Sequence, residues 1–129
     1  MNNIYHLALM DHYRNPRNRY TLEEPDFAGE QENAYCADKV HFAGKLCAAT
    51  KTISELAFSG QGCVLSQAIA SMISEQFILK PIEQVFMGND ENFVCALAGS
   101  PLGPTRLKCA LLGLKALQQA IATYKERNA

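Results

Sequence analysis

The sequence predicts an α+β fold in which helices pack on one face of a small antiparallel sheet of about three strands. The chain has 129 residues, which is the usual size of one domain, so we expect residues 1–129 to form a single domain. Alternating apolar residues indicate strands in the first half of the chain, and apolar residues at helical spacing dominate the second half. An order of helix, strands and then helices is typical of α+β domains.

The chain is expected to begin with a helix and an acidic segment. Residues 3–13 favour a helix because Ile4, Leu7 and Ala8 share one face. The sequence RNPRN at residues 14–18 should end this helix, since proline disfavours helix in the residue before it. Residues 21–35 carry five acidic side chains and few apolar ones, so we expect a loop with a short strand around residues 28–32.

Two strands are expected next. Within residues 39–48, Val40, Phe42 and Leu46 alternate with polar residues, which is the pattern of a half-buried strand. Residues 51–59 are also rich in strand-forming residues, and the join around residues 48–50 favours an antiparallel hairpin. The glycines at positions 60 and 62 should end the second strand.

The second half of the chain is expected to be mostly helical. Residues 64–78 place an apolar stripe on one helix face. Its members are Leu65, Ala68, Ile69, Met72, Ile73 and Gln76. A short helix near 81–86 should begin at Pro81, and residues 88–105, with three glycines and two prolines, should be mostly loop. The last helix is expected over residues 105–126, with its leucines inward and Lys108, Lys115 and Gln119 facing out.

The composition excludes several classes of protein. Hydrophobic residues make up 48% and charged residues 19% of the chain, which excludes a disordered or collagen-like sequence. A net charge of −1 gives no support for nucleic-acid binding. No apolar run approaches the roughly 18 residues that a membrane helix needs. The start of the sequence lacks the basic and small-residue features of a signal peptide, so we expect a cytoplasmic protein without nucleic-acid or membrane partners.

The cysteines favour metal or redox chemistry. The five are Cys36, Cys47, Cys63, Cys95 and Cys109. An odd number in a chain without export features argues against a disulfide framework. No two cysteines are spaced as CxxC, so any site must be assembled from distant segments.

Two of these cysteines precede or begin predicted elements. Cys36 and Asp38 lie two residues apart just before the first clear strand, and side chains at that spacing point the same way in extended backbone. Cys63 lies between a glycine turn and the start of a helix, where the unpaired N–H groups and the helix dipole stabilise a thiolate.

A third cysteine, Cys109, lies near the start of the last helix. Arg106 and Lys108 are its neighbours in sequence, and their positive charges should stabilise the Cys109 thiolate if the side chain is exposed. Lys108 is equally explained as an exposed helix residue. The three histidines are expected to be surface residues.

Together, Cys36, Asp38, Cys63 and Cys109 would supply three sulfur ligands and one oxygen ligand. Such a set suits tetrahedral zinc or the iron of a cluster. The carboxylate is a weaker ligand for iron than a thiolate, and it would allow a bound metal or cluster to be released. On composition and spacing alone a second interpretation stays open, because a lone cysteine is usually a small core residue. Cys47 and Cys95 are expected to be core or surface thiols.

Four motifs in this chain resemble those of the U-type iron–sulfur cluster assembly proteins, the family of IscU, SufU and the N-terminal domain of NifU. The matching segments are DHYRNPRN at residues 11–18, NAYCAD at 33–38, GQGCVLSQA at 60–68 and RLKCA at 106–110. They occur in the family order and extend over nearly the whole chain.

The resemblance implies an IscU/SufU-like fold and a scaffold function. Proteins of this family receive persulfide sulfur from a PLP-dependent cysteine desulfurase, build a [2Fe–2S] cluster and pass it to apo-proteins. The implied ligands are Cys36, Cys63 and Cys109, with Asp38 as the labile ligand, and zinc would occupy the same site in the absence of a cluster. The chain departs from the family pattern at Ala37, where the family has glycine, and an alanine there should shift the turn before Asp38.

Two further functions stay open. One is a zinc-dependent sulfurtransferase of the SufU type that accepts persulfide and stimulates a desulfurase. Cys36 would accept the sulfur, with Cys109 as the alternative acceptor, and Arg106 and Lys108 would steer the persulfide by charge. Lys108 follows the SufU branch, whereas the short spacing between the second and third motif cysteines follows IscU and favours the scaffold. The other is a structural zinc module that only binds a partner. The sequence therefore favours a carrier over an enzyme without excluding sulfurtransferase activity.

Overall fold

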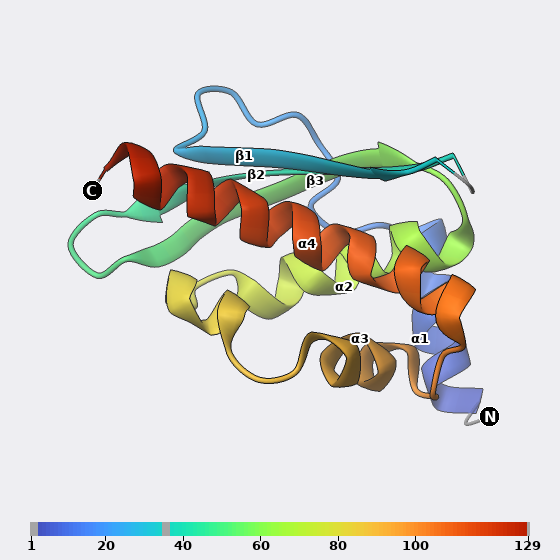
Figure 1. Cartoon of the computed structure of the whole chain (residues 1–129). Coiled ribbons are helices and arrows are strands. Elements are labelled where there is room, and N and C mark those ends of the chain that lie inside the picture. Colours follow the sequence, from blue (N-terminus) through green and yellow to red (C-terminus); the bar gives the residue numbers. More distant parts are fainter. Residues whose placement is uncertain (1–2, 35–36, 129) are drawn as a thin grey trace.

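A computed structural model describes residues 3–34 and 37–128 of the chain (Figure 1). The elements in chain order are helix α1 (Asn3–Arg14), strands β1 (Phe27–Asn33), β2 (Asp38–Cys47) and β3 (Thr52–Gln61), helix α2 (Val64–Phe77), the 3₁₀-helix η1 (Ile82–Phe86), and helices α3 (Asp90–Ala98) and α4 (Pro104–Arg127). The predicted α+β fold with a three-stranded antiparallel sheet is confirmed.

Three strand termini lie together at one end of the sheet. Its strand order is β1-β2-β3, with β2 in the centre and both pairings antiparallel. Asn33 at the end of β1 pairs with Asp38 at the start of β2, and Lys39 pairs with Gln61 at the end of β3. Because β3 leads directly into α2, the start of that helix lies at the same end of the sheet as Asp38.

The core lies between the sheet and the helices that cover one of its faces (Figure 1). Helix α4 packs against β1 and β2, and α2 packs against β3 and α4. The largest fully buried side chains of the sheet are Phe27, Val40, Phe42, Ile53, Leu56 and Phe58. Residues between α1 and β1 run over the opposite face of the sheet. In the described part of the chain, no helix is long and apolar enough to cross a bilayer.

Most predicted boundaries agree with the structure to within two residues, but the region 88–105 was predicted wrongly. It contains α3, whose start is capped by the Asn89 side chain accepting the backbone N–H of Asn92 at 2.9 Å. The helix ends at Gly99, which adopts a left-handed conformation with φ 79°. An Asn cap and a following glycine are helix signals, and the prolines and glycines after residue 99 obscured them.

Helix α2 is buried over more of its surface than the predicted stripe. Gln76 is exposed, whereas the polar residues Ser66, Gln67, Ser71 and Ser74 are buried. A buried polar side chain needs hydrogen-bond partners. Gln67, Ser71 and Ser74 each have a partner in a segment that approaches α2 from elsewhere in the chain. Ser66 instead bonds to the neighbouring Cys63 and Gln67.

Candidate metal centre

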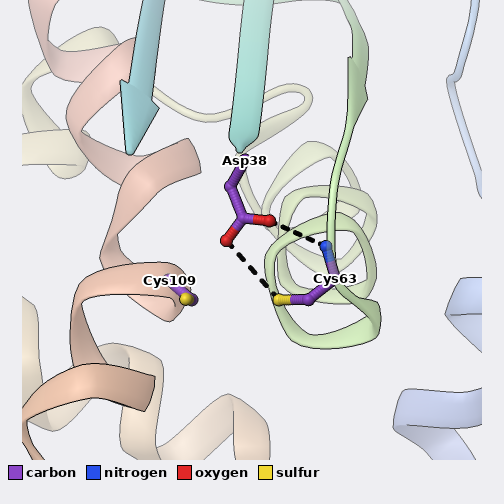
Figure 2. A group of neighbouring side chains, drawn as sticks. All are labelled: Asp38, Cys63 and Cys109. Atoms are coloured by element: carbon purple, nitrogen blue, oxygen red, sulfur yellow. Dashed lines mark hydrogen bonds between the residues drawn. The ribbon is translucent and has the colours of Figure 1, made fainter. Parts of the chain in front are cut away.

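Asp38, Cys63 and Cys109 place their side-chain donor atoms within 4.8 Å of one another (Figure 2). Asp38 is the first residue of β2, Cys63 is the N-cap of α2, and Cys109 lies in the second turn of α4. Figure 2 shows the carboxylate of Asp38 between the two cysteines. Three elements that are distant in sequence therefore bring one oxygen donor and two sulfur donors together.

The two oxygens of Asp38 make different contacts. Its side chain is buried, with 1% exposure. Oδ1 accepts the backbone N–H of Cys63 at 2.7 Å, and Oδ2 lies 3.5 Å from Cys63 Sγ, where the thiol donates to it. One oxygen thus fixes the turn before α2, while the other faces the sulfur and could serve as a ligand once the thiol proton is released.

Gly62 makes the close approach of Asp38 to this turn sterically possible. Its φ is 140°, a value that side chains on L-residues rarely allow, and a Cβ there would lie 2.1 Å from Asp38 Oδ1. Glycine is the residue that tolerates such a backbone conformation and such an approach. The glycine before Cys63 is therefore a requirement of the Asp38 contact.

Cys63 faces the N-terminal turn of α2. Its Sγ accepts the backbone N–H of Ser66 at 3.4 Å, and Ser66 Oγ donates to the carbonyl oxygen of Cys63 at 3.2 Å. Sulfur here takes the capping position that an Asp or Ser oxygen usually occupies. Cys63 is exposed to solvent, so the donor cluster is accessible from its side.

Cys109 is buried, with 5% exposure. The sequence favoured a Cys109 thiolate only for an exposed side chain, so that condition is not met. Asn33 Nδ2 donates to Cys109 Sγ over 4.0 Å, a long contact that links the end of β1 to the cluster. Arg106 and Lys108 are exposed, as expected for helix surface residues. Neither side chain pairs with any part of the chain that the structure describes.

The remaining cysteines divide into two groups. Cys36, the fourth expected ligand, lies outside the described residues. Cys47 is exposed at the opposite end of β2 from Asp38, and Cys95 is half-buried in α3. A hydrogen bond from Thr50 holds the pKa of the Cys47 thiol below its usual range. Neither Cys47 nor Cys95 belongs to the donor cluster.

Ala37 precedes Asp38 in a left-handed conformation, with φ 54°. A glycine adopts this conformation without strain, whereas for other L-residues it costs about 1–2 kcal/mol. The backbone at Ala37 is therefore strained, where a glycine would not be.

The segment at residues 11–18 is anchored to α2. Ser71 Oγ accepts the backbone N–H of Arg17 at 2.9 Å and lies 2.7 Å from His12 Nδ1, and Asn18 Nδ2 donates to Ser74 Oγ at 3.0 Å. The His12 side chain is only 12% exposed, so the expectation of a surface histidine is wrong for this residue. Its pKa is lowered, chiefly by burial and also by the charge of Arg17.

Sequence reasoning assigned no role to three residues that surround the cluster. Ser66 follows Cys63 by three residues, and this capping spacing could have identified it. Asn33 and Gln67 offered no comparable signal, because the first acts across the sheet edge and the second from within a buried helix.

Comparison with known proteins identifies the family. Residues 4–129 match the family model described as NifU-like N terminal domain. The chain is 30% identical to the zinc-dependent sulfurtransferase SufU of Bacillus subtilis, over 99% of this chain and 96% of that protein. It is 32% identical to the iron–sulfur cluster assembly scaffold protein IscU of Aquifex aeolicus, over 93% of this chain and 75% of that protein.

A solved structure agrees with this result. A protein of Fervidobacterium islandicum described as an iron–sulfur cluster assembly scaffold for the SUF system superposes with a TM-score of 0.77 at 26% identity, covering 88% of this chain and 93% of that one. The resemblance predicted from the four motifs is confirmed. The chain belongs to the NifU-like N-terminal domain family.

Proposed function

We propose that this protein is an iron–sulfur cluster assembly scaffold. In this proposal it receives persulfide sulfur from a PLP-dependent cysteine desulfurase, assembles a [2Fe–2S] cluster and transfers the cluster to apo-proteins. The observation that carries the proposal is the convergence of Asp38, Cys63 and Cys109, with donor atoms within 4.8 Å of one another. The odd number of cysteines fits a reducing compartment, and we expect the protein to act in the cytoplasm.

The donor chemistry fits both iron–sulfur clusters and zinc. Two sulfurs and a carboxylate oxygen form an incomplete tetrahedral set, and soft sulfur ligands suit zinc and iron–sulfur clusters alike. We propose Cys36, two residues before Asp38 in sequence, as the remaining ligand. Zinc would be held by the same four residues in the cluster-free protein, where it would keep the thiols deprotonated.

Asp38 is proposed as the labile ligand. Its Oδ1 accepts the N–H of Cys63, and this hydrogen bond draws charge away from the carboxylate and weakens it as a donor to metal. Iron also prefers thiolate to carboxylate in clusters. Since Cys63 is the exposed member of the cluster, release of the cargo is expected to begin on the side where Asp38 and Cys63 meet.

The second candidate function is a zinc-dependent sulfurtransferase. It is favoured by the similarity to the Bacillus SufU over 99% of the chain. It is also favoured by the exposed cations Arg106 and Lys108, which lie near Cys109 in sequence and form no ion pair within the described residues. In this function Cys36, or Cys109 as the alternative, would attack the outer sulfur of the desulfurase persulfide. The new S–S bond forms on the acceptor, and the desulfurase cysteine leaves as a thiolate.

The spacing between Cys63 and Cys109 favours the scaffold. It is short, as in the IscU branch, and lacks the longer insertion of SufU relatives.

One experiment separates the two functions. The protein is assayed for zinc and iron, then incubated anaerobically with a cysteine desulfurase, cysteine, ferrous iron and dithiothreitol. The reductant is needed because converting persulfide sulfur to sulfide takes more electrons than the oxidation of ferrous iron supplies. The visible spectrum and the alanine released are both recorded.

A [2Fe–2S] spectrum with little change in the rate of alanine release would support the scaffold. A large rise in that rate, with zinc retained and no chromophore, would support the sulfurtransferase. If neither effect is observed, both proposals are refuted, and a structural zinc module is the function that remains. Cys63→Ser should abolish the positive result, and Cys47→Ser is the matched control because Cys47 is also exposed but lies outside the cluster.

A further inference from the structure

We infer that Gln67 is a positioning residue for the candidate metal centre. Its side-chain amide ties the start of β2, which carries Asp38, to the first turn of α2, which carries Cys63. The inference rests on the proposed function, because it assigns Gln67 a role in a centre that binds metal.

The amide of Gln67 contacts both segments directly. Nε2 donates to the carbonyl oxygen of Lys39 at 3.3 Å and to Ser66 Oγ at 3.1 Å. Lys39 follows Asp38 in the chain. Ser66 in turn donates through Oγ to the Cys63 carbonyl and through its backbone N–H to Cys63 Sγ. The amide group thus contacts Lys39, the chain neighbour of Asp38, and Ser66, the hydrogen-bond partner of Cys63.

The Gln67 side chain carries a cost to folding stability that opposes the gain from its two hydrogen bonds. The Gln67 residue is 7% exposed, and its Oε1 is buried without a hydrogen-bond partner among the residues that the structure describes. A buried acceptor without a partner opposes folding. An apolar side chain of similar length would avoid that cost on a helix that is buried over most of its surface. The two hydrogen bonds of Nε2 therefore point to a role in arranging the site.

Gly60 provides the space for this contact. A Cβ at Gly60 would lie 2.2 Å from the Lys39 carbonyl oxygen and 3.1 Å from Gln67 Oε1. Any side chain at this position would displace the carbonyl that the amide binds. The end of β3, the start of β2 and the amide of α2 therefore fit together only with glycine at residue 60.

Loss of the amide should loosen the centre without dismantling it. The hydrogen bond from the Cys63 N–H to Asp38 would remain, while Lys39 and Ser66 would lose their shared donor. Replacing groups that orient metal ligands typically lowers metal affinity about 10–100-fold. Because Gln67 acts one step further from the ligands, we expect about the lower end of this range.

The test compares Gln67→Met with Gln118→Met in the full chain. Gln118 is a matched control, since its Nε2 also bridges two segments, donating to the Val85 carbonyl at 3.0 Å and to Asp90 Oδ1 at 3.1 Å, away from the donor cluster. Methionine matches glutamine in length and removes the unpartnered acceptor, so folding should be retained. Gln67→Leu serves as a second apolar replacement.

Four measurements are made on each variant. Zinc affinity is measured by competition with a chromophoric chelator, and the visible spectrum of bound Co²⁺ reports the geometry of the ligands. Hydrogen–deuterium exchange of the metal-free protein reports the mobility of residues 38–41 and 62–67. The thermal unfolding midpoint is recorded to exclude a general loss of stability.

We expect Gln67→Met to lower zinc affinity about tenfold, to alter the Co²⁺ spectrum and to accelerate exchange in both segments, while Gln118→Met changes none of these. Equal zinc affinity and equal spectra in the two variants would overturn the role of Gln67 while leaving the proposed function intact. A wild-type protein that binds neither zinc, cobalt nor a cluster would refute the proposed function, and the inference with it.

Discussion

Asp38 offers the sharpest test of the site, because its two oxygens have separable roles. In metal-free protein, Asp38→Ala removes the hydrogen bond that Oδ1 accepts from Cys63 N at 2.7 Å. A hydrogen bond to a charged group contributes about 1.5–3 kcal/mol. Removing a carboxylate that is only 1% exposed recovers part of its desolvation cost. The free energy of unfolding should therefore fall by about 1–2 kcal/mol.

Asp38→Asn should behave differently. The amide oxygen can still accept the Cys63 N–H, and the amide NH₂ would face Cys63 Sγ in place of Oδ2. The free energy of unfolding should stay within about 1 kcal/mol of wild type, since a neutral hydrogen bond replaces a charged one. The proposed carboxylate ligand is nevertheless lost, so zinc affinity should fall at least about a hundredfold, which corresponds to about 2.7 kcal/mol.

Urea unfolding with a chelator measures the structural role, and zinc competition measures the ligand role. The two variants should differ in the free energy of unfolding and should show a similar loss of zinc affinity. If both variants unfold at the same urea concentration, the hydrogen bond to Cys63 does not stabilise the turn. If Asp38→Asn binds zinc as tightly as wild type, the carboxylate is not a ligand and the proposed set of donors is wrong.

The other predictions concern the same turn and its surroundings. Asp38→Cys should hold a [2Fe–2S] cluster longer than wild type against a chelator, because a thiolate replaces the weaker ligand; an unchanged or shorter lifetime would contradict the labile role of Asp38. Gly62→Ala should lower the free energy of unfolding by about 3 kcal/mol or more, since its Cβ would meet Asp38 Oδ1; Gly103→Ala, which meets nothing within 4 Å, is the control. Ala37→Gly should raise the free energy of unfolding by about 0.5–1 kcal/mol, the difference between the left-handed strain and the added flexibility of glycine; a loss of stability in urea would refute the strain. Because burial lowers the pKa of His12 from 6.5, the unfolded chain binds a proton more readily, so stability should fall as the pH drops below about 6.5; His12→Gln should reduce this fall in urea midpoints, whereas His6→Gln, at an exposed residue, should not.

The sequence predicted those parts of the fold that local patterns determine. Strand β2 was found from the alternation of Val40 and Phe42, and both residues are fully buried in the structure. Helix α3 was missed because Gly99 and the prolines beyond it were interpreted as loop residues, although Gly99 ends the helix. The cap at Asn89 was the signal that should have outweighed them.

The site was predicted only in part, for a physical reason. The patterns around Cys63 and Asp38 are local, because a helix start and a strand start can be recognised from a few neighbouring residues. The burial of Cys109 and the contact of Gln67 with Lys39 depend on how α4 and α2 pack against the sheet. Such contacts join residues 28 or more positions apart, and a short sequence window does not contain them.

The motif at residues 11–18 shows why a resemblance alone does not assign roles to residues. In sequence it matches the family pattern in the same way as the motifs that contain Cys63 and Cys109. In the structure its Arg17 and Asn18 bind the buried hydroxyls of Ser71 and Ser74 on α2. These two serines lie on the helix whose N-cap is Cys63.

The position of α2 relative to β2 fixes the distance between Cys63 and Asp38, and the packing of α2 on α4 fixes the distance to Cys109. A segment that anchors α2 therefore helps to set the geometry of the candidate metal centre, although it does not contact the three donor residues. Together the motifs correspond to one requirement, the relative placement of β2, α2 and α4, which brings the donor atoms of Asp38, Cys63 and Cys109 together.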